Sequence, residues 1–343
     1  MSTTHKKLKS AKTPKHRQKI VVVIGPTASG KSEFAVRLAK KYNGEIISAD
    51  SRQVYRGLNI GTGKVPGKWQ KQSSATNYQS HLMRQLWAGR PKVDAKVFVY
   101  KDVVHHCIDF VPPRRQYSVA DFKRDGTKAF LDIIARNKTP IICGGTGQYV
   151  DALLTDQTLP EVAPNLKLRA NLEKKTTAEL FAELEKKDPT RAKSIDPHNP
   201  RRLIRALEII ASTGKVPEMT SYIDLKTYRQ HGLELPIEVV YLNPSREELY
   251  KKIERRLVAR IKEGMISEVT KLRKNGVPWK RLHDLGLEYR FVSQYLRSTS
   301  TVSLAQKINP NNFIKSFYFT SLLSEIRHYA KRQQTWFKKY TIQ

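Results

Sequence analysis

The chain has 343 residues and is strongly basic, since 63 lysines and arginines against 31 aspartates and glutamates give a formal net charge of +32. A hydrophobic content of 39% is that of a globular protein, and this length predicts two or three domains. No apolar run approaches the roughly 18 residues of a membrane span, and neither cysteine has metal-ligand spacing, so we expect a cytoplasmic protein without membrane attachment, disulfide bonds or structural zinc.

The N-terminal half alternates between strand and helix patterns. Residues 1–19 contain seven lysines and arginines and no acid, which predicts a flexible basic arm. Ser118 is followed three residues later by Asp121, a spacing that resembles a capping box and begins a predicted helix. Three short apolar runs predict strands, namely residues 20–24, 45–50 and 139–143. This order is typical of a doubly wound α/β domain, whose first part we assign to residues 20–158.

The C-terminal half is mostly helical. Prolines interrupt helical segments between residues 159 and 235, which we interpret as an inserted helical subdomain. Strand character returns at 237–242, and residues 236–343 are expected to complete the core and add basic helices, the last at about 316–340. Residues 64–104 are polar and irregular, and no element is predicted there.

A phosphate-binding loop is the sharpest motif. The sequence G-x-x-x-x-G-K-S lies between a predicted strand and a predicted helix, which is the context that this motif requires. Its backbone N–H groups and the helix dipole favour an anion, Lys31 adds a charge, and the Ser32 hydroxyl is a candidate Mg²⁺ ligand. The motif predicts diphosphate binding without specifying ATP. The expected diphosphate-binding residues are Gly25, Pro26, Thr27, Ala28, Ser29, Gly30, Lys31 and Ser32.

Two further residues follow predicted strands. Asp50 ends one strand and Thr146 follows another, so both are expected beside the phosphate-binding loop, because ligands bind at the carboxyl ends of parallel strands. Taken alone, Asp50 also fits a helix cap and Thr146 a turn.

Seven segments closely resemble the tRNA dimethylallyltransferase family, in order, over most of residues 20–340. They are residues 25–32, 47–62, 105–109, 117–122, 144–147, 199–208 and 329–337. No cysteine follows Cys143, so the zinc finger of many eukaryotic members is missing and the chain resembles the bacterial type.

The resemblance implies a reaction and a role for each matching residue. The loop would hold dimethylallyl diphosphate with Mg²⁺, and Asp50 would be the general base for N6 of adenosine 37, beside the anticodon in the tRNA anticodon stem-loop. Thr146 would lie near the bridging oxygen, and Arg256 would stabilise the departing pyrophosphate. The enzyme would be a monomer. The implied tRNA contacts are Asp50, Ser51, Arg52, Gln53, Thr146, Arg169, Arg201, Arg202, Leu203, Ile204, Arg205, Lys331, Arg332 and Gln333.

Several assignments have alternatives. The arginines of 201–205 also fit a solvated helix face, and Trp336 and Phe337 fit core positions. Arg256 is preferred to Arg255 and Arg260 on the resemblance alone. Two segments depart from the family pattern: residues 285–290 read LGLEYR where a Gly-Tyr-Arg element is usual, and 64–104 is longer than the corresponding connection.

Three other functions compete with this interpretation. An adenylate isopentenyltransferase would prenylate a free nucleotide and would not need a charge of +32. A P-loop small-molecule kinase would transfer a γ-phosphoryl group. An RNA-binding protein with an inactive loop would not need Lys31, Ser32 and Asp50 together.

Overall fold

The fold is described from a computed structural model, for residues 18–71, 96–155, 160, 162–217, 227–298 and 303–341. Of the predicted basic arm, only Gln18 and Lys19 belong to these ranges. The chain divides into two compact units, one formed by Leu154–Ile223 and the other by Met1–Leu153 with Asp224–Gln343.

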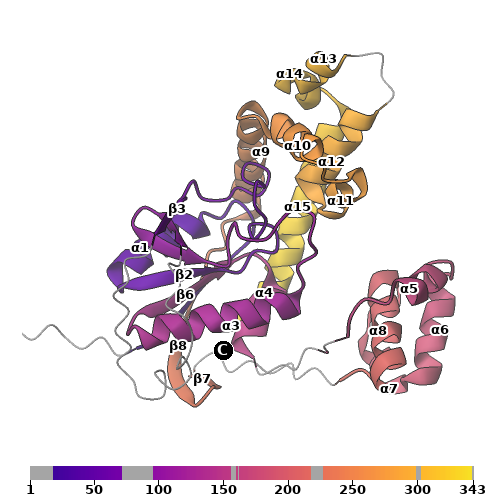
Figure 1. The fold of residues 1–343 in the computed structure, drawn as a ribbon, viewed down its shortest axis with the longest axis horizontal. Helices are drawn as coiled ribbons and strands as arrows, with labels where there is room; N and C mark the ends of the chain where they lie inside the picture. Colours follow the sequence, from indigo (N-terminus) through magenta and orange to yellow (C-terminus); the bar gives the residue numbers. More distant parts are fainter. Residues whose placement is uncertain are drawn as a thin grey trace, which may run out of the picture. The chain divides into compact units, whose positions relative to one another are not determined.

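A mixed sheet forms the centre of the larger unit (Figure 1). Among the described residues it has eight strands in the order β3-β4-β5-β2-β6-β1-β8-β7. The strands are β1 (Ile20–Ile24), β2 (Gly44–Ser48), β3 (Lys68–Lys71), β4 (Lys96–Tyr100), β5 (Val103–His106), β6 (Thr139–Gly144), β7 (Thr227–Gln230) and β8 (Leu233–Tyr241). The five central strands are parallel, and β3, β4 and β7 pair antiparallel at the edges. The predicted doubly wound core is confirmed.

Strand β1 is buried along its whole length because it pairs with β6 on one side and β8 on the other. Alternate residues such as Val21 and Val23 pack against Ala35 and Val36 of helix α1 (Lys31–Lys41), which covers one face of the sheet. This double burial explains the unalternating IVVVI sequence. The phosphate-binding loop is thereby fixed between a rigid strand and the helix that follows it.

Helix α3 (Val119–Ala135) begins at the predicted capping box. The Ser118 Oγ accepts a hydrogen bond from the Asp121 N–H at 3.1 Å, and the Asp121 carboxylate accepts one from the Ser118 N–H at 2.9 Å. The helix contacts β2 and β6, and these strands lie between α1 and α3 in Figure 1. Helix α4 (Gly147–Leu154) then follows β6.

The structure corrects two sequence-based expectations. Residues 64–104 are not irregular throughout, because β3, β4 and the first half of β5 lie in this segment and extend the sheet. The helical unit spans Leu154–Ile223 rather than 159–235, because β7 pairs with β8 and belongs to the main sheet. Tyr228 of β7 packs on Phe130 of α3, with ring centroids 4.9 Å apart.

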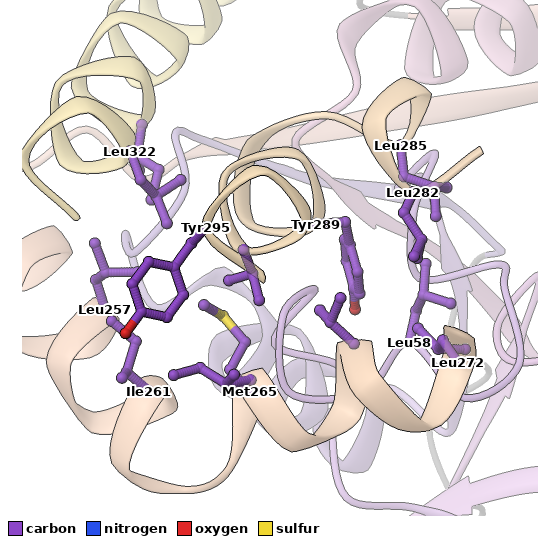
Figure 2. Packing of buried hydrophobic residues seen from close by; sticks show 14 of the residues in the cluster. Leu58, Leu257, Ile261, Met265, Leu272, Leu282, Leu285, Tyr289, Tyr295 and Leu322 are labelled. Atoms are coloured by element: carbon purple, nitrogen blue, oxygen red, sulfur yellow. The ribbon is translucent and has the colours of Figure 1, made fainter. Parts of the chain in front are cut away.

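A helical cluster completes the larger unit. It contains α9 (Arg246–Lys262), α10 (Met265–Lys274), α11 (Trp279–Asp284), α12 (Leu287–Arg297), α13 (Leu304–Ile308), α14 (Pro310–Ile314), α15 (Phe317–Phe337) and a short 3-10 turn, η1 (Lys338–Tyr340). Figure 2 shows its apolar core, where Leu257 and Ile261 of α9 lie near Met265 and Tyr295. Because α9 buries every fourth residue from Leu249 to Ile261, the helix is fixed in rotation and its adjacent arginine face has one orientation.

The smaller unit is a helical bundle of α5 (Leu166–Leu172), α6 (Thr177–Lys187), α7 (Pro189–Ser194) and α8 (Pro200–Thr213). Its core includes Leu180, Leu184, Leu203 and Leu207. In neither unit is any described helix both long and apolar enough to cross a membrane.

Candidate active site

A cavity of about 360 Å³ lies at the carboxyl edge of the parallel strands in the larger unit. The phosphate-binding loop and the residues after β2 form one side, and α9, α12 and α15 form another. The lining includes Thr27, Ala28, Gly30, Lys31, Ser32, Asp50, Arg52, Gln53, Gly63, Lys64, Arg256, Arg260, Glu288, Tyr329 and Gln333. Segments far apart in the sequence therefore meet at one polar site.

The phosphate-binding loop has the backbone that its glycines allow. Gly30 has a φ of 86° at the start of α1, and a side chain at Gly25 would lie 2.4 Å from the Leu242 carbonyl oxygen. Lys31 folds back, and its ammonium donates to the Pro26 carbonyl at 2.9 Å. Burial and the charges of Arg256 and Arg260 lower the pKa of Lys31 to about 8. The positive charges of Lys31, Arg256 and Arg260 therefore favour binding of an anion in the cavity.

Asp50 stabilises a turn and also lines the cavity. Its Oδ1 accepts hydrogen bonds from the N–H groups of Arg52, at 2.9 Å, and Gln53, at 3.2 Å, so the carboxylate orientation is fixed. Oδ2 accepts no hydrogen bond from any residue that the structure describes. The cap alternative and the catalytic assignment are thus compatible, since one oxygen holds the turn and the other is available.

Thr146 supports the Asp50 turn. Its Oγ1 accepts a hydrogen bond from the Ser51 N–H at 3.1 Å and lies 3.4 Å from the Ser51 hydroxyl, and its own N–H donates to the Ala49 carbonyl at 3.1 Å. Thr146 is not one of the cavity-lining residues. The structure therefore gives it a positioning role, and its expected place near the bridging oxygen stays a prediction.

The structure distinguishes the three arginines of α9. Arg255 is exposed, whereas Arg256 and Arg260 are one turn apart and both line the cavity. Burial, with the nearby charge of Arg260, lowers the pKa of Arg256 to about 10. The cavity therefore favours Arg256 over Arg255 as an anion ligand. Arg260 lines the same cavity and meets the same criterion.

Helix α15 contributes Tyr329 and Gln333. Gln333 is buried; its Oε1 accepts from the Thr27 N–H at 2.8 Å and its Nε2 donates to the Gly145 carbonyl at 2.7 Å. Gln333 was expected to contact tRNA, but both ends of its amide are engaged inside the protein. Tyr329 lines the cavity, and burial raises the pKa of its hydroxyl to about 12.

The remaining expected tRNA contacts of this unit differ in exposure. Arg52 is partly buried with its Nη1 3.4 Å from Glu288, and Gln53 donates to the Thr62 and Gly63 carbonyls at 3.4 Å each. Lys331 and Arg332 are exposed on α15. Trp336, expected in the core, is 38% exposed and donates to Asp151, whereas Phe337 is buried as expected.

The expected tRNA contacts in the smaller unit differ in exposure and in their partners within the protein. Arg201 and Arg202 are exposed at the first turn of α8. Arg169 and Arg205 are both held by the buried Glu208, at 2.7 and 3.3 Å. Leu203 and Ile204 are core residues and cannot be side-chain contacts to tRNA, because a helix that presents 201 and 202 turns the next two positions inward.

The site contains residues that sequence reasoning missed. Glu288, at the start of α12, lies between Arg52 and Arg260, and loop residues Gly63 and Lys64 complete the wall. The spacing of Arg256 and Arg260 by four residues was the available signal, because such residues share one helix face. Within the altered 285–290 element, the buried Tyr289 donates from its hydroxyl to Glu268 at 2.8 Å. That carboxylate also accepts from the N–H groups of 59–61.

A magnesium ion has few protein ligands to use here. No group of three or more His, Cys, Asp or Glu side chains that could hold a metal occurs among the described residues. Ser32 and Asp50 offer oxygen atoms to the same cavity. This donor set fits Mg²⁺, which commonly uses one or two protein oxygens together with substrate phosphates and water.

Comparisons with known proteins agree with this geometry. The family model described as IPP transferase matches residues 95–340, and that described as isopentenyl transferase matches residues 18–79. The chain is 39% identical to tRNA dimethylallyltransferase 2 of Treponema denticola, over 93% of this chain and 91% of that protein. It is 37% identical to tRNA dimethylallyltransferase 2 of Pelobacter propionicus, over 94% and 86%.

A solved structure is similar in both sequence and fold. The tRNA isopentenylpyrophosphate transferase of Bacillus halodurans has a TM-score of 0.53 and 32% identity, covering 94% of this chain and 87% of that one. A eukaryotic dimethylallyltransferase solved acting on tRNA has a TM-score of 0.64 at 24% identity, covering 94% of this chain and 70% of that one, and shows a shared fold.

Proposed function

This chain belongs to the IPP transferase family, and from that premise we propose that it moves a dimethylallyl group from dimethylallyl diphosphate to N6 of adenosine 37 in the tRNA anticodon loop. Its activity as a tRNA dimethylallyltransferase follows from the relatives. The observation that supports the detailed mechanism is the cavity in which the phosphate-binding loop, Asp50 and Arg256 meet.

Asp50 is the proposed general base. The N6 amine attacks the allylic carbon, the new C–N bond forms, and the proton leaves to a carboxylate oxygen. An amine of this kind is barely acidic, so the base acts as the bond forms rather than before it. The Arg52 and Gln53 N–H groups hold Oδ1, which leaves Oδ2 of Asp50 for the proton.

The cations of the cavity stabilise the leaving group. As the bond between the allylic carbon and the diphosphate oxygen breaks, the electron pair goes to that oxygen and pyrophosphate departs. Lys31 and Arg256 place positive charge where this negative charge develops, together with the N–H groups of the loop. Magnesium, held by the Ser32 hydroxyl, would neutralise part of the diphosphate charge when bound.

On the tRNA side we propose an anticodon stem-loop as the recognised element. The target base must leave its stack to bring N6 to Asp50, which costs a few kcal/mol. Phosphate contacts from the exposed Arg201, Arg202, Lys331 and Arg332 would offset that cost. We further propose that the protein works as a monomer in the cytoplasm, where its tRNA substrate is available.

The relatives support this function over the alternatives of a nucleotide prenyltransferase or a small-molecule kinase. A direct test is incubation with labelled dimethylallyl diphosphate and Mg²⁺, in turn with an anticodon stem-loop and with AMP, followed by nucleoside analysis. The expected product is N6-dimethylallyladenosine at position 37 of the stem-loop only. Equal prenylation of AMP would contradict the proposed substrate, and hydrolysis of ATP at a comparable rate would favour the kinase.

A further inference from the structure

Arg260 has a buried donor that nothing in the described protein satisfies. The residue is only 9% exposed. Its Nη1 lies 3.3 Å from both the Gly61 carbonyl and a Glu288 oxygen, which are long hydrogen bonds. Its Nη2 is buried without a hydrogen-bond partner among the residues that the structure describes. An unpaired guanidinium N–H is costly inside a protein, so this atom calls for an acceptor.

The surrounding loop is shaped to admit this group. Gly63 has a φ of 59°, and a Cβ built there would lie 1.7 Å from the Nη2 of Arg260 and 2.5 Å from the Nη2 of Arg256. Both guanidinium groups therefore lie against the same point of the loop, where the left-handed φ favours glycine and a side chain would displace them. Two like charges placed side by side repel each other, and an anion bound in front of both offsets this repulsion.

The protein supplies too little negative charge for this pair. Arg260 shares the Glu288 carboxylate with Arg52, at 3.3 and 3.4 Å respectively. No carboxylate of the described residues lies within 4.0 Å of the Arg256 guanidinium. The neighbouring Lys31 ammonium adds a third cation to the same cavity. A ligand with several negative oxygens would meet all three groups.

We propose that Arg260 is a second guanidinium ligand of the diphosphate, which binds the substrate with Arg256 and stabilises the departing pyrophosphate. This inference rests on the proposed function. Two arginines four residues apart on a fixed helix present parallel donors, an arrangement suited to the oxygens of two linked phosphates. Arg260 Nη2 would donate to a diphosphate oxygen, and Nη1 would keep its contact with Glu288.

The test compares Arg260→Gln with Arg255→Gln, which removes the same charge from an exposed position of the same helix. Calorimetry with Mg²⁺ and inorganic pyrophosphate gives the affinity of each variant. We expect Arg260→Gln to weaken pyrophosphate binding roughly 10-fold or more, the scale for losing a charged hydrogen bond in a buried site. Arg255→Gln should bind pyrophosphate as the wild type does. Wild-type affinity in Arg260→Gln would overturn the proposal.

A second variant tests whether Arg260→Gln weakens pyrophosphate binding only indirectly, through loss of the ion pair between Arg260 and Glu288. Glu288→Gln removes a competing negative charge and leaves Arg260 in place, so pyrophosphate should bind more tightly than to the wild type. Weaker binding to Glu288→Gln, matching that to Arg260→Gln, would show that only the ion pair matters and would refute a direct contact. Failure of the wild type to prenylate tRNA would instead refute the proposed function, which separates the two ideas.

Discussion

Asp50 combines an observed structural role with the proposed role of general base. The N–H groups of Arg52 and Gln53 bind Oδ1, and that part of the arrangement survives if the side chain becomes an amide. Asp50→Asn therefore separates the two roles, because asparagine keeps an acceptor oxygen and loses the basic one. This substitution gives a sharper test than alanine, which would also release the turn.

We expect Asp50→Asn to lower the single-turnover rate of transfer by roughly 100-fold or more, the usual scale for losing a general base. The affinity for tRNA and the melting temperature should change little. Rapid-quench measurements with saturating dimethylallyl diphosphate report the chemical step. Transfer at a near-normal rate would remove Asp50 from the mechanism.

Lys31 gives the site a pH dependence. Since its pKa is lowered to about 8, the ammonium loses its proton as the pH rises through that value. Affinity for pyrophosphate should thus fall between about pH 7 and pH 9, because a neutral amine no longer attracts the anion. Lys31→Arg keeps its charge over this range and should lack that decline. Calorimetric titrations at several pH values compare the two proteins, and ionisation of pyrophosphate itself is common to both. Parallel profiles would exclude Lys31 as the titrating group.

At the scale of elements, α15 is tied to the phosphate-binding loop by Gln333. The hydrogen bonds to Thr27 and Gly145 cross from the last long helix to the turns after β1 and β6. Loss of this amide would leave a buried donor and a buried acceptor unpaired, at about 1–3 kcal/mol each. Gln333 therefore links α15 to the phosphate-binding loop.

This link predicts opposite effects for two neighbouring substitutions. Gln333→Leu should raise the KM for dimethylallyl diphosphate and lower the melting temperature, with little change in tRNA affinity. Arg332→Gln, at an exposed position, should weaken tRNA binding and leave that KM unchanged. Steady-state kinetics and tRNA filter binding measure both. A tRNA defect confined to Gln333→Leu would restore the original assignment of Gln333 as an RNA contact.

A buried ion cluster holds β2 against its neighbours. Glu45 accepts from Arg136 Nη2 at 2.6 Å and Lys138 Nζ at 2.8 Å, and His106 Nε2 lies 2.7 Å away. Burial alone would raise the pKa of Glu45, but hydrogen bonds from Arg136 and His106 hold it well below its usual value. A carboxylate with a lowered pKa stabilises the fold at neutral pH, and this contribution is lost as the pH falls below about 4.5.

Glu45→Gln should destabilise the protein by about 1–3 kcal/mol at pH 7, because Arg136 and Lys138 lose a buried carboxylate partner while Arg136 keeps its ion pair with Asp132. The difference from the wild type should shrink as the pH is lowered from 5 to 3. Glu247→Gln, in an exposed pair with Lys251, is the control and should cost less than about 1 kcal/mol. Urea unfolding at several pH values checks both. A pH-independent difference would point to packing rather than charge.

For the whole molecule, the sequence predicted four of the five central strands (β1, β2, β6 and β8), the phosphate-binding loop and the family, because each rests on local patterns and short spacings. It missed β3, β4, β5 and β7, which are each only four or five residues long and are held in the sheet by pairing with neighbouring strands. It placed Gln333 among the tRNA contacts and left Arg260 without a role, because their partners Thr27, Gly145 and Glu288 are brought together only by the fold. Long-range contacts of this kind leave no periodicity in the sequence.

The net charge of +32 is a property of the whole molecule, and its main expected consequence is that the affinity for tRNA depends on the salt concentration. Binding to the proposed anticodon stem-loop would release counterions, so affinity should fall steeply with salt, with a slope that reports the number of phosphates neutralised. Arg201 and Arg202 are the sharpest probes, because both are exposed, whereas Arg205 also holds Glu208 and Val162 within the smaller unit.

Replacing Arg201 and Arg202 by Ala should flatten the salt slope by roughly one unit per arginine, and leave affinity for dimethylallyl diphosphate unchanged. Lys186→Ala with Lys187→Ala is the charge-matched control at exposed positions of α6 in the same unit, and should leave the slope near its wild-type value. Fluorescence anisotropy with a labelled stem-loop at several salt concentrations gives each slope. Equal slopes for both double variants would mean that total charge, rather than a tRNA contact at the start of α8, governs binding.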